Sequence, residues 1–530
     1  MEFLRPALLA VWWLSLGVTS LRFVHMFQLS AYQTPGFLRW LRQHGGEVYQ
    51  RMIWALLPVL LSLWGEDWPV WLLLASIGFY VLSAVAARPP RGAKKPLKYT
   101  SRVARLLVTL GVLAGAAAWG FSFLWGLPTR FLAVLLGAGY FLAPLFVLAA
   151  NAVNIPVQKL IEWRYIRDAK RRLADCPKLT VIGLTGSYGK TSVKHFLHRL
   201  LSESYNTLIT PGSYNTPMGV VKTIRGELRP THEFFVCEMG ARHVGDIKEL
   251  CGIVHPRHGL ITTIGPQHLE TFGTQERIAD TKFELIDALP HDGVAFLNMN
   301  CELIRDRRVD CRRVRFGLAE DGAERAADWD YRGFDLKAGP EGLSFSVAFP
   351  DGELRRFSTA LIGRHNAENI LAALAVAHHF GVPPPRLAAA VRALEPVAHR
   401  LRLLPRGAGL SIIDDAFNAN PEGARAALET LDGFDGVKIL VTPGFVELGE
   451  RQDECHETLG WQASAVCDFV ALVGRRQTEA IARGLKAAGF PEERLLVADT
   501  LGEAMVAAQA WPSAGREKYV LLENDLPDNY

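Results

Sequence analysis

The hydrophobic and polar positions along the chain divide it into two parts of different character. Long apolar stretches cover residues 4–21, 53–64, 68–87, 106–125 and 131–153. Most of them approach the roughly 20 residues that an α-helix needs to cross a bilayer. Beyond residue 175, short apolar runs alternate with amphipathic segments of helical period. The pattern therefore predicts a membrane domain of about five transmembrane helices at residues 1–155, followed by an α/β region.

Basic residues indicate the orientation of these helices. One set follows the third apolar stretch and another follows the fifth: Arg88, Arg91, Lys94, Lys95, Lys98, Arg102 and Arg105, then Lys159, Arg164, Arg167, Lys170, Arg171 and Arg172. By the positive-inside rule, both sets face the cytoplasm. Residues 156–175 are then a basic juxtamembrane linker, and the α/β region that follows is cytosolic.

Charge and cysteine content exclude some classes of function. The formal net charge of +4 over 530 residues is close to balance, so composition gives no indication of a nucleic-acid partner. The seven cysteines are scattered and form no CxxC pair. This is typical of reduced thiols, and neither a disulfide framework nor a zinc site is expected.

A glycine-rich turn lies between an apolar run at residues 179–184 and a helical pattern at residues 193–201. Its residues are Thr185, Gly186, Ser187, Tyr188, Gly189, Lys190, Thr191 and Ser192. In such a strand–turn–helix, backbone N–H groups face a phosphate, the lysine adds a positive charge, and the threonine hydroxyl can reach Mg²⁺. The position five before Gly189 is Leu184, so the turn departs from the common Walker A spacing. The turn predicts a nucleotide site of a less common type.

The α/β region reads as two domains separated by a proline-rich step near residues 383–396. Residues 176–395 predict a P-loop domain with a doubly wound, mostly parallel sheet, and residues 396–530 a smaller Rossmann-like α/β domain. Ligands of such sheets bind at the carboxyl ends of the strands. Polar residues follow the predicted strands at Glu238, His268 and Asp415.

These strand-end residues leave alternatives open when each is taken alone. Glu238 could join Thr191 as a Mg²⁺ ligand, but a glutamate at a strand end is more often a cap or a salt-bridge partner. His268 is a weak Mg²⁺ ligand and, taken alone, is better explained as a loop histidine. The pair Asp414-Asp415 could contact a ribose or a cation, or lie in a solvated loop.

Eight segments together resemble one family. They occur in this order: residues 185–192, 238–247, 264–273, 279–298, 363–373, 399–404, 414–421 and 444–450. The series is similar to the Mur ligase family, in the branch that joins D-alanyl-D-alanine to a UDP-N-acetylmuramoyl tripeptide. The likeness covers roughly residues 176–480 and implies the family's P-loop fold, ATP and two Mg²⁺ sites.

The resemblance implies roles for the residues around the metals. Lys190 would bind the β- and γ-phosphates, and Thr191 with Glu238 would hold one Mg²⁺. His268 would join the second Mg²⁺ together with Lys282, which matches a carbamylated lysine of the family. Without the motif, Lys282 would read as a solvated helix lysine.

The resemblance also implies contacts to the nucleotide from both domains. Asn298, His365 and Asn366 match residues on the adenine side. Arg400 would reach the γ-phosphate, and Asp415 would bind the ribose. These last two lie beyond the predicted domain boundary, so catalysis should need domain closure.

The implied activity is an ATP-dependent, ADP-forming amide ligase of peptidoglycan synthesis, a multi-pass protein of the bacterial plasma membrane with cytoplasmic catalytic domains. Residues 1–155 replace the family's UDP-binding domain, and residues 521–530 depart from its glycine- and arginine-bearing loop. A lipid-linked muropeptide or a γ-glutamyl chain is therefore an alternative substrate. A membrane protein whose ATPase domain senses nucleotide or drives transport is an alternative of another class.

Overall fold

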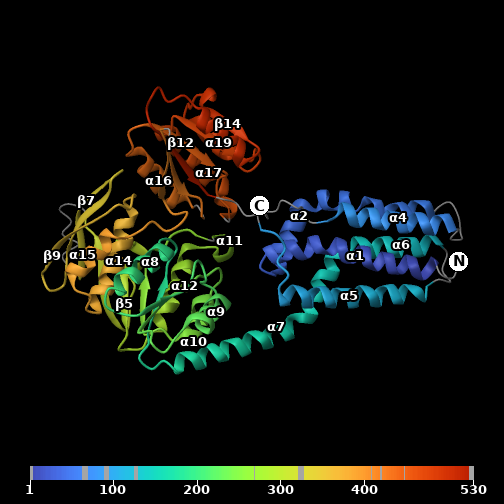
Figure 1. Ribbon diagram of the computed structural model, residues 1–530, viewed down its shortest axis with the longest axis horizontal. Coiled ribbons are helices and arrows are strands. Elements are labelled where there is room, and N and C mark those ends of the chain that lie inside the picture. The colour runs from blue at the N-terminus through green and yellow to red at the C-terminus, as the bar shows by residue number, and fades with distance from the viewer. Residues whose placement is uncertain are drawn as a thin grey trace. The chain divides into compact units, whose positions relative to one another are not determined.

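The computed structural model describes residues 4–62, 70–88, 95–124, 129–267, 269–319, 328–407, 409–417, 420–446 and 448–524. The chain forms two compact units, which meet in sequence at Arg164 and Tyr165. The first unit is helical, and the second is built on two β-sheets (Figure 1). This division separates the apolar part of the sequence from the part that carries the glycine-rich turn.

The first unit is a bundle of apolar helices. The elements are α1 (Leu4–Leu29), α2 (Thr34–Arg51), a 3₁₀ turn (Ile53–Leu56), α3 (Leu57–Leu61), α4 (Val70–Ala86), α5 (Ser101–Ser122), α6 (Thr129–Phe141) and the part of α7 (Ala143–Ala174) that ends at Arg164. Aromatic side chains fill its core, and Trp12, Phe23, Phe27 and Phe37 are fully buried. Phe37 of α2 packs edge-on against Phe27 of α1, with ring centroids 5.3 Å apart.

Some of the apolar stretches form helices long enough to span a membrane. Among the described residues these are Pro6–Leu29, Ser101–Ser122 and Ala143–Ala174, while the apolar helix α4 has 17 residues. The stretch at residues 131–153 is not one helix, because the chain turns at Leu142 between α6 and α7. Pro144, in the first turn of α7, fits there because the N–H groups of a first turn have no partner within the helix.

The first sheet of the second unit is mostly parallel. Its strands are β1 (Thr180–Thr185), β2 (Thr207–Ile209), β3 (Phe234–Glu238), β4 (His258–Ile261), β5 (Val294–Asn298), β6 (Arg312–Leu318), β7 (Tyr331–Gly339), β8 (Gly342–Ala348) and β9 (Leu354–Thr359). They lie in the order β2-β3-β1-β4-β5-β6-β7-β8-β9, with β7, β8 and β9 antiparallel. The strand order reverses between β1 and β4, which is where an open α/β sheet binds its ligand.

Helices cover both faces of this sheet. They are α8 (Lys190–Leu201), α9 (Pro217–Glu227), α10 (Asp246–Val254), α11 (Leu269–Phe272), α12 (Gln275–Asp287), α13 (Glu302–Arg305), α14 (His365–His379) and α15 (Pro384–Arg392). Apolar side chains of α8, α14 and α15 form one core with the strands. Those of α9, α10 and α12 form the core on the other face. The doubly wound arrangement predicted for this region agrees with the observed layers.

The second sheet is smaller and contains the remaining strands. They are β10 (Arg402–Gly407), β11 (Leu410–Asp415), β12 (Val437–Thr442), β13 (Phe469–Val473), β14 (Leu495–Ala498) and β15 (Lys518–Glu523), in the order β10-β11-β15-β12-β13-β14. Helices α16 (Pro421–Asp432), α17 (Gln452–Val466) and α18 (Glu479–Ala487) pack on one face, and α19 (Leu501–Ala510) on the other. All strand pairs are parallel except β10 with β11. The last strand of the chain therefore lies between β11 and β12.

Candidate functional site

The glycine-rich turn joins the end of β1 to the start of α8. Gly186 and Gly189 have φ angles of 150° and 78°, which glycine adopts without steric cost. A Cβ atom on Gly186 would collide with the Thr262 hydroxyl, and one on Gly189 with the side chain of Asn369. The two glycines therefore let the turn pack closely against its neighbours, and its N–H groups stay available at the start of α8.

The turn is fixed to the segment that follows β4. The Ser187 N–H donates to the Thr263 carbonyl at 2.6 Å, and the Thr262 hydroxyl donates to the Tyr188 carbonyl at 2.6 Å. The Ser187 hydroxyl also donates to the Gly265 carbonyl at 3.0 Å. A loop held at several points keeps its shape before a ligand binds, which reduces the cost of ordering it on binding.

Lys190 begins α8 and points back over the turn. Its ammonium group donates to the carbonyl oxygens of Gly186 at 2.6 Å and Ser187 at 2.8 Å. Burial lowers the pKa of Lys190 to about 8, Glu238 opposes the shift, and Arg400 adds to it. The side chain therefore lies where a phosphate would contact the turn, and it is mostly charged at neutral pH.

Thr191 and Glu238 are brought together as predicted. The Thr191 hydroxyl lies 3.2 Å and 3.3 Å from the two carboxylate oxygens of Glu238, at the end of β3. Lys194 forms an ion pair with Glu238 at 2.9 Å, and the Asn215 amide donates to it at 3.1 Å. Burial alone would raise the pKa of Glu238, but the charges of Lys194 and Lys190 hold it below its usual value. The oxygens of Thr191 and Glu238 suit a hard cation such as Mg²⁺.

Lys282 lies inside the protein on α12. Its exposed fraction is 3%. Burial lowers its pKa to about 7, and the charge of Lys190 adds to this shift. The alternative interpretation of Lys282 as a solvated helix lysine is excluded, because α12 packs this face against the sheet. A lysine with this pKa is about half neutral amine near pH 7.

The structure describes only one of the two residues predicted for the second metal site, Lys282. His268 lies outside the described residues. Among the described residues, there is no group of three or more histidine, cysteine, aspartate or glutamate side chains that could hold a metal. Lys282 could contribute only in carbamylated form, because a carbamate supplies oxygen atoms.

The residues predicted for the adenine side lie at the end of β5 and at the start of α14. Asn298 ends β5, and its amide donates to the Thr263 hydroxyl at 3.4 Å. His365 and Asn366 begin α14, and the Asn366 amide donates to the Ile362 carbonyl at 2.8 Å. Burial lowers the pKa of His365 to about 4, so its ring is neutral at pH 7. Neutral polar groups of this kind are suited to a nucleotide base.

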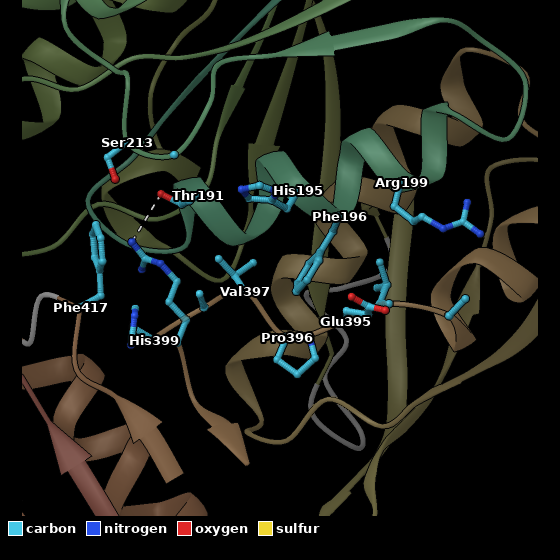
Figure 2. Close-up of a pocket in the computed structure, with 15 residues that line it drawn as sticks. Thr191, His195, Phe196, Arg199, Ser213, Glu395, Pro396, Val397, His399 and Phe417 are labelled. Atoms are coloured by element: carbon cyan, nitrogen blue, oxygen red, sulfur yellow. Dashed lines mark hydrogen bonds between the residues drawn. The ribbon is translucent and has the colours of Figure 1, made fainter. Parts of the chain in front are cut away.

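Arg400 lies just before β10, the first strand of the second sheet, and Asp415 ends β11 of the same sheet. The Arg400 guanidinium donates to the Thr191 hydroxyl at 3.4 Å and lies 4.7 Å from the centre of the Phe417 ring (Figure 2). Asp415 accepts a hydrogen bond from the Leu401 N–H at 3.1 Å. The arginine thus reaches the glycine-rich turn from outside the first sheet.

A cavity of about 600 Å³ opens beside Thr191 and Arg400. It is lined by Thr191, His195, Phe196, Arg199, Gly212, Ser213, residues 393–400 and Phe417. Figure 2 shows that the side chains of His195, Phe196 and Arg199 extend from α8 at successive positions along the helix. The segment that contains Pro396 and Val397 faces this helix across the cavity. Arg400 and Thr191 therefore border this cavity, whereas Asn298 and His365 are not among the described residues that line it.

Sequence reasoning missed several residues of the site. Lys194 lies one helical turn after Lys190, a spacing that places both on one side of α8, and this was an available signal. Asn215 and Asn369 gave no such signal, because they come from a loop and a helix that only the folded chain brings to the turn. Their positions depend on contacts over long sequence separations.

Comparison with known proteins assigns the two sheet-containing parts of the chain to one family. Residues 184–377 match the model of the Mur ligase middle domain, and residues 399–522 match that of the Mur ligase glutamate ligase domain. The chain belongs to the Mur ligase family over these two ranges. The resemblance drawn from the eight sequence segments is therefore confirmed.

Individual Mur ligases are similar to the same part of the chain. UDP-N-acetylmuramoyl-tripeptide–D-alanyl-D-alanine ligase of Bacillus subtilis is 33% identical over 283 residues, which cover 53% of this chain and 59% of that protein. The crystal structure of MurF from Acinetobacter baumannii has a TM-score of 0.61 at 27% identity, covering 68% of this chain and 77% of that one. MurF of Thermotoga maritima in complex with ADP has a TM-score of 0.59 at 27% identity, with 69% and 80% covered. The chain thus spans less than two thirds of the curated relative's length.

Proposed function

We propose that this Mur ligase is an ATP-dependent, ADP-forming amide ligase of peptidoglycan precursor synthesis that joins D-alanyl-D-alanine to a UDP-N-acetylmuramoyl tripeptide. The observation that carries the proposal is the hydrogen bond from the Arg400 guanidinium to the hydroxyl of Thr191 in the glycine-rich turn, at 3.4 Å. Cationic groups from two parts of the fold converge there on one position. The similarity to MurF proteins supports the choice of substrates.

The residues of the site fit transfer of a phosphoryl group to a carboxylate. The donor carboxylate and the γ-phosphate are both anions, so positive charge is needed where they meet. Lys190 and Arg400 would supply it. Thr191 and Glu238 would hold Mg²⁺, which when bound neutralises charge on the phosphate oxygens. The resulting acyl phosphate has a good leaving group, and an amine can displace phosphate from it.

Lys282 is proposed to carry a carbamate. A neutral amine reacts with CO₂, whereas an ammonium group does not, and the pKa of about 7 leaves much of Lys282 neutral at physiological pH. The carbamate would place a negative charge near the positive charge of Lys190. We propose that it acts there with His268 at a second Mg²⁺ site.

Nucleotide contacts outside the turn complete the proposed site. Asn298, His365 and Asn366 would face the adenine, and Asp415 the ribose. We propose a domain boundary near residue 395, because β9 ends at Thr359 in the first sheet and β10 begins at Arg402 in the second. The donor would occupy the cavity next to Arg400, where His195 and Arg199 offer polar contacts.

We further propose that residues 1–155 hold the enzyme in the plasma membrane of a bacterium, with residues 156–175 as the basic linker and the catalytic domains in the cytoplasm. Three helices long and apolar enough to span a membrane support this among the described residues. The same helices favour a second candidate substrate, a lipid-linked muropeptide, because such a donor would be presented at the membrane surface.

Ligation by detergent-solubilised full-length protein, followed by mass spectrometry, tests the proposal. The reaction contains ATP, Mg²⁺, D-alanyl-D-alanine and either the UDP-linked tripeptide or its lipid-linked form. A pentapeptide product with one ADP per amide bond is expected from the UDP-linked donor. Product from the lipid-linked donor alone would identify the lipid-linked muropeptide as the substrate. ATP turnover without any amide product would favour a nucleotide-driven membrane protein.

A further inference from the structure

Helix α1 of the first unit carries two ionisable side chains near its end. It is one of the helices long and apolar enough to span a membrane, yet Arg22 and His25 lie within about 10 Å of its last residue, Leu29. The two positions are three residues apart, so their side chains lie on the same side of the helix. Ionisable side chains in a membrane-spanning segment are costly, and where they occur they mark ligand sites or ion paths.

Both side chains have buried nitrogen atoms that make no hydrogen bond. These atoms are Nε and Nη1 of Arg22 and Nδ1 of His25, among the residues that the structure describes. His25 is 1% exposed, and its Nε2 donates to the Lys95 carbonyl at 2.8 Å. No other arginine in the described part of the chain has buried nitrogen atoms of this kind. Buried groups left without a partner in a native protein point to a function or an absent ligand.

Other buried polar groups of α1 find partners inside the unit. The Trp12 indole donates to the Leu136 carbonyl at 2.8 Å, and the hydroxyls of Thr19 and Tyr140 lie 2.6 Å apart. Along the described residues of α1, the buried polar side-chain atoms without a partner belong to residues 20, 22 and 25. These atoms therefore gather in one segment near the end of the helix, where a single ligand can account for the arginine and the histidine together.

Basic residues gather at the same end of α1. The segment before α5 docks there, because the Gln28 amide donates to the Lys98 carbonyl at 2.9 Å and accepts from the Lys98 N–H at 2.9 Å. The Arg102 guanidinium lies 3.9 Å from the centre of the Tyr32 ring, just beyond α1. Lys95, whose carbonyl contacts His25, belongs to the same segment. An anion at this end of the helix would be attracted by several positive charges.

The chemistry of these groups suits a phosphate. A guanidinium binds phosphate oxygens through two parallel N–H bonds, and Nε with one Nη forms such a pair. The charged side chains near Arg22 are Glu47 and Arg51 of α2, which are exposed and opposite in sign. They offset each other, so the charge of Arg22 is left for a ligand. Because Nε2 of His25 donates to Lys95, its Nδ1 accepts, and a phosphate hydroxyl can donate to it.

The depth of Arg22 favours a phosphate that belongs to a lipid. The apolar helix Pro6–Leu29 has 24 residues, which is about 36 Å, and the hydrocarbon core of a bilayer is about 30 Å thick. The end of the helix then lies among the headgroups, with Arg22 close to the boundary of the hydrocarbon core. A lipid phosphate resides at this boundary, whereas a free phosphate ion stays in water.

We propose that Arg22 and His25 bind the phosphate group of a membrane lipid at the cytoplasmic end of α1. This inference rests on the proposed membrane placement of residues 1–155, and it does not depend on the ligase chemistry. It gives the helical unit a ligand-binding role in addition to anchoring. The site lies on the membrane face at which a lipid-linked donor would be presented.

Lipid binding to the full-length protein in a neutral detergent, measured by native mass spectrometry, tests the site. The two probes are dioleoyl phosphatidate and dioleoylglycerol, which has the same chains and no phosphate. The wild-type protein should bind the phosphatidate at least about tenfold more tightly. Arg22→Gln should reduce that preference to about twofold or less. Arg42→Gln, which removes the same charge from an exposed position of α2, is the matched control and should keep the preference.

Three results would overturn the inference. An unchanged preference in Arg22→Gln would make Arg22 a purely structural residue. An equal loss in Arg42→Gln would attribute the preference to the overall positive charge of this end of the unit. Displacement of the phosphatidate by millimolar inorganic phosphate would show a site for the free ion and not for a lipid.

A second variant keeps the test decisive if Arg22→Gln does not fold. Arg22→Lys retains the positive charge without the paired N–H groups of a guanidinium, so it should show an intermediate preference. A preference equal to that of the wild type in Arg22→Lys would count against a contact between guanidinium and phosphate.

The proposed function and the lipid site fail separately. Binding needs no turnover, so protein that forms no amide product would refute the ligase proposal and leave the lipid result unchanged. Full-length protein that stays in solution without detergent would refute the membrane placement, and this inference with it.

Discussion

The buried ion pair between Lys194 and Glu238 provides the sharpest test of the site. The Lys194 ammonium group lies 2.9 Å from the Glu238 carboxylate, and the side chains are 0% and 2% exposed. Lys194 also donates to the Gly212 carbonyl at 2.5 Å. Lys194→Met removes the charge and keeps the apolar stem, so the variant leaves Glu238 with the Thr191 hydroxyl and the Asn215 amide as neutral donors.

The magnitude follows from the burial of both partners. Removing one member of a buried pair costs about 3–5 kcal/mol, and the two donors that remain favour the lower end. We expect Lys194→Met to lower Tm by roughly 5 °C or more. Lys248→Met removes the same charge from an exposed position of α10 and should leave Tm unchanged.

The effect should also depend on pH and on magnesium. In the wild type, Lys194 and Lys190 hold the pKa of Glu238 below its usual value, so the pair stabilises the fold above about pH 4.5 and that contribution is lost as pH falls further. In Lys194→Met, burial raises the pKa of Glu238, and the loss of stability should be larger at pH 8 than at pH 5. Millimolar Mg²⁺ should raise the Tm of the variant more than that of the wild type, because the ion replaces the missing charge.

Differential scanning calorimetry of the full-length protein measures these shifts, with Lys194→Met/Glu238→Gln as the double variant. Neutralising Glu238 should restore part of the stability, because the unpaired buried charge is then gone. A Tm loss that is the same at pH 5 and pH 8, and that Glu238→Gln does not reduce, would refute the reasoning.

Three further predictions concern catalysis. Lys190→Met should lower kcat for ATP-dependent ligation by at least about 100-fold, because the positive charge over the glycine-rich turn is lost. A near-normal kcat in this variant would show that Lys190 has no role in phosphoryl transfer. Arg400→Met should lower kcat by a similar factor of about 100 while ADP affinity, measured by calorimetry, stays within about twofold; a loss confined to ADP affinity would contradict a role at the γ-phosphate. Wild-type activity should fall in CO₂-free buffer and return with bicarbonate, whereas Lys282→Ala should be inactive in both; a fully active Lys282→Ala would exclude the carbamate.

Local sequence features predicted the parts of the site that lie close together in the chain. Glycines at 186 and 189, with Lys190 and Thr191 after them, define the turn, because its shape depends on a few backbone angles and on the adjoining strand and helix. A strand is predicted to lead to Glu238, and Glu238 is the last residue of β3. The resemblance to Mur ligases then extended the prediction to Arg400, whose contact with Thr191 joins residues 209 positions apart.

Hydrophobic patterning was less reliable where helices are interrupted or packed. The apolar stretch at residues 131–153 reads as one helix, yet it is divided between α6 and α7, since mean hydropathy does not register a turn at Leu142. The helical pattern without the family motif would place Lys282 in solvent, yet tertiary packing of α12 buries it. In both cases the deciding interactions are absent from the local sequence.

The sequence by itself determined the glycine-rich turn, the alternation of strands and helices and the family, because these depend on short-range patterns and on ordered motifs. Only the tertiary structure placed Lys194 and Asn215 on Glu238, and Glu523 beside Asp415. The strand order puts β15, the last strand of the chain, between β11 and β12. Periodicity reveals that a strand exists but not which strand lies next to it, since neighbours in a sheet are chosen by packing across the whole domain.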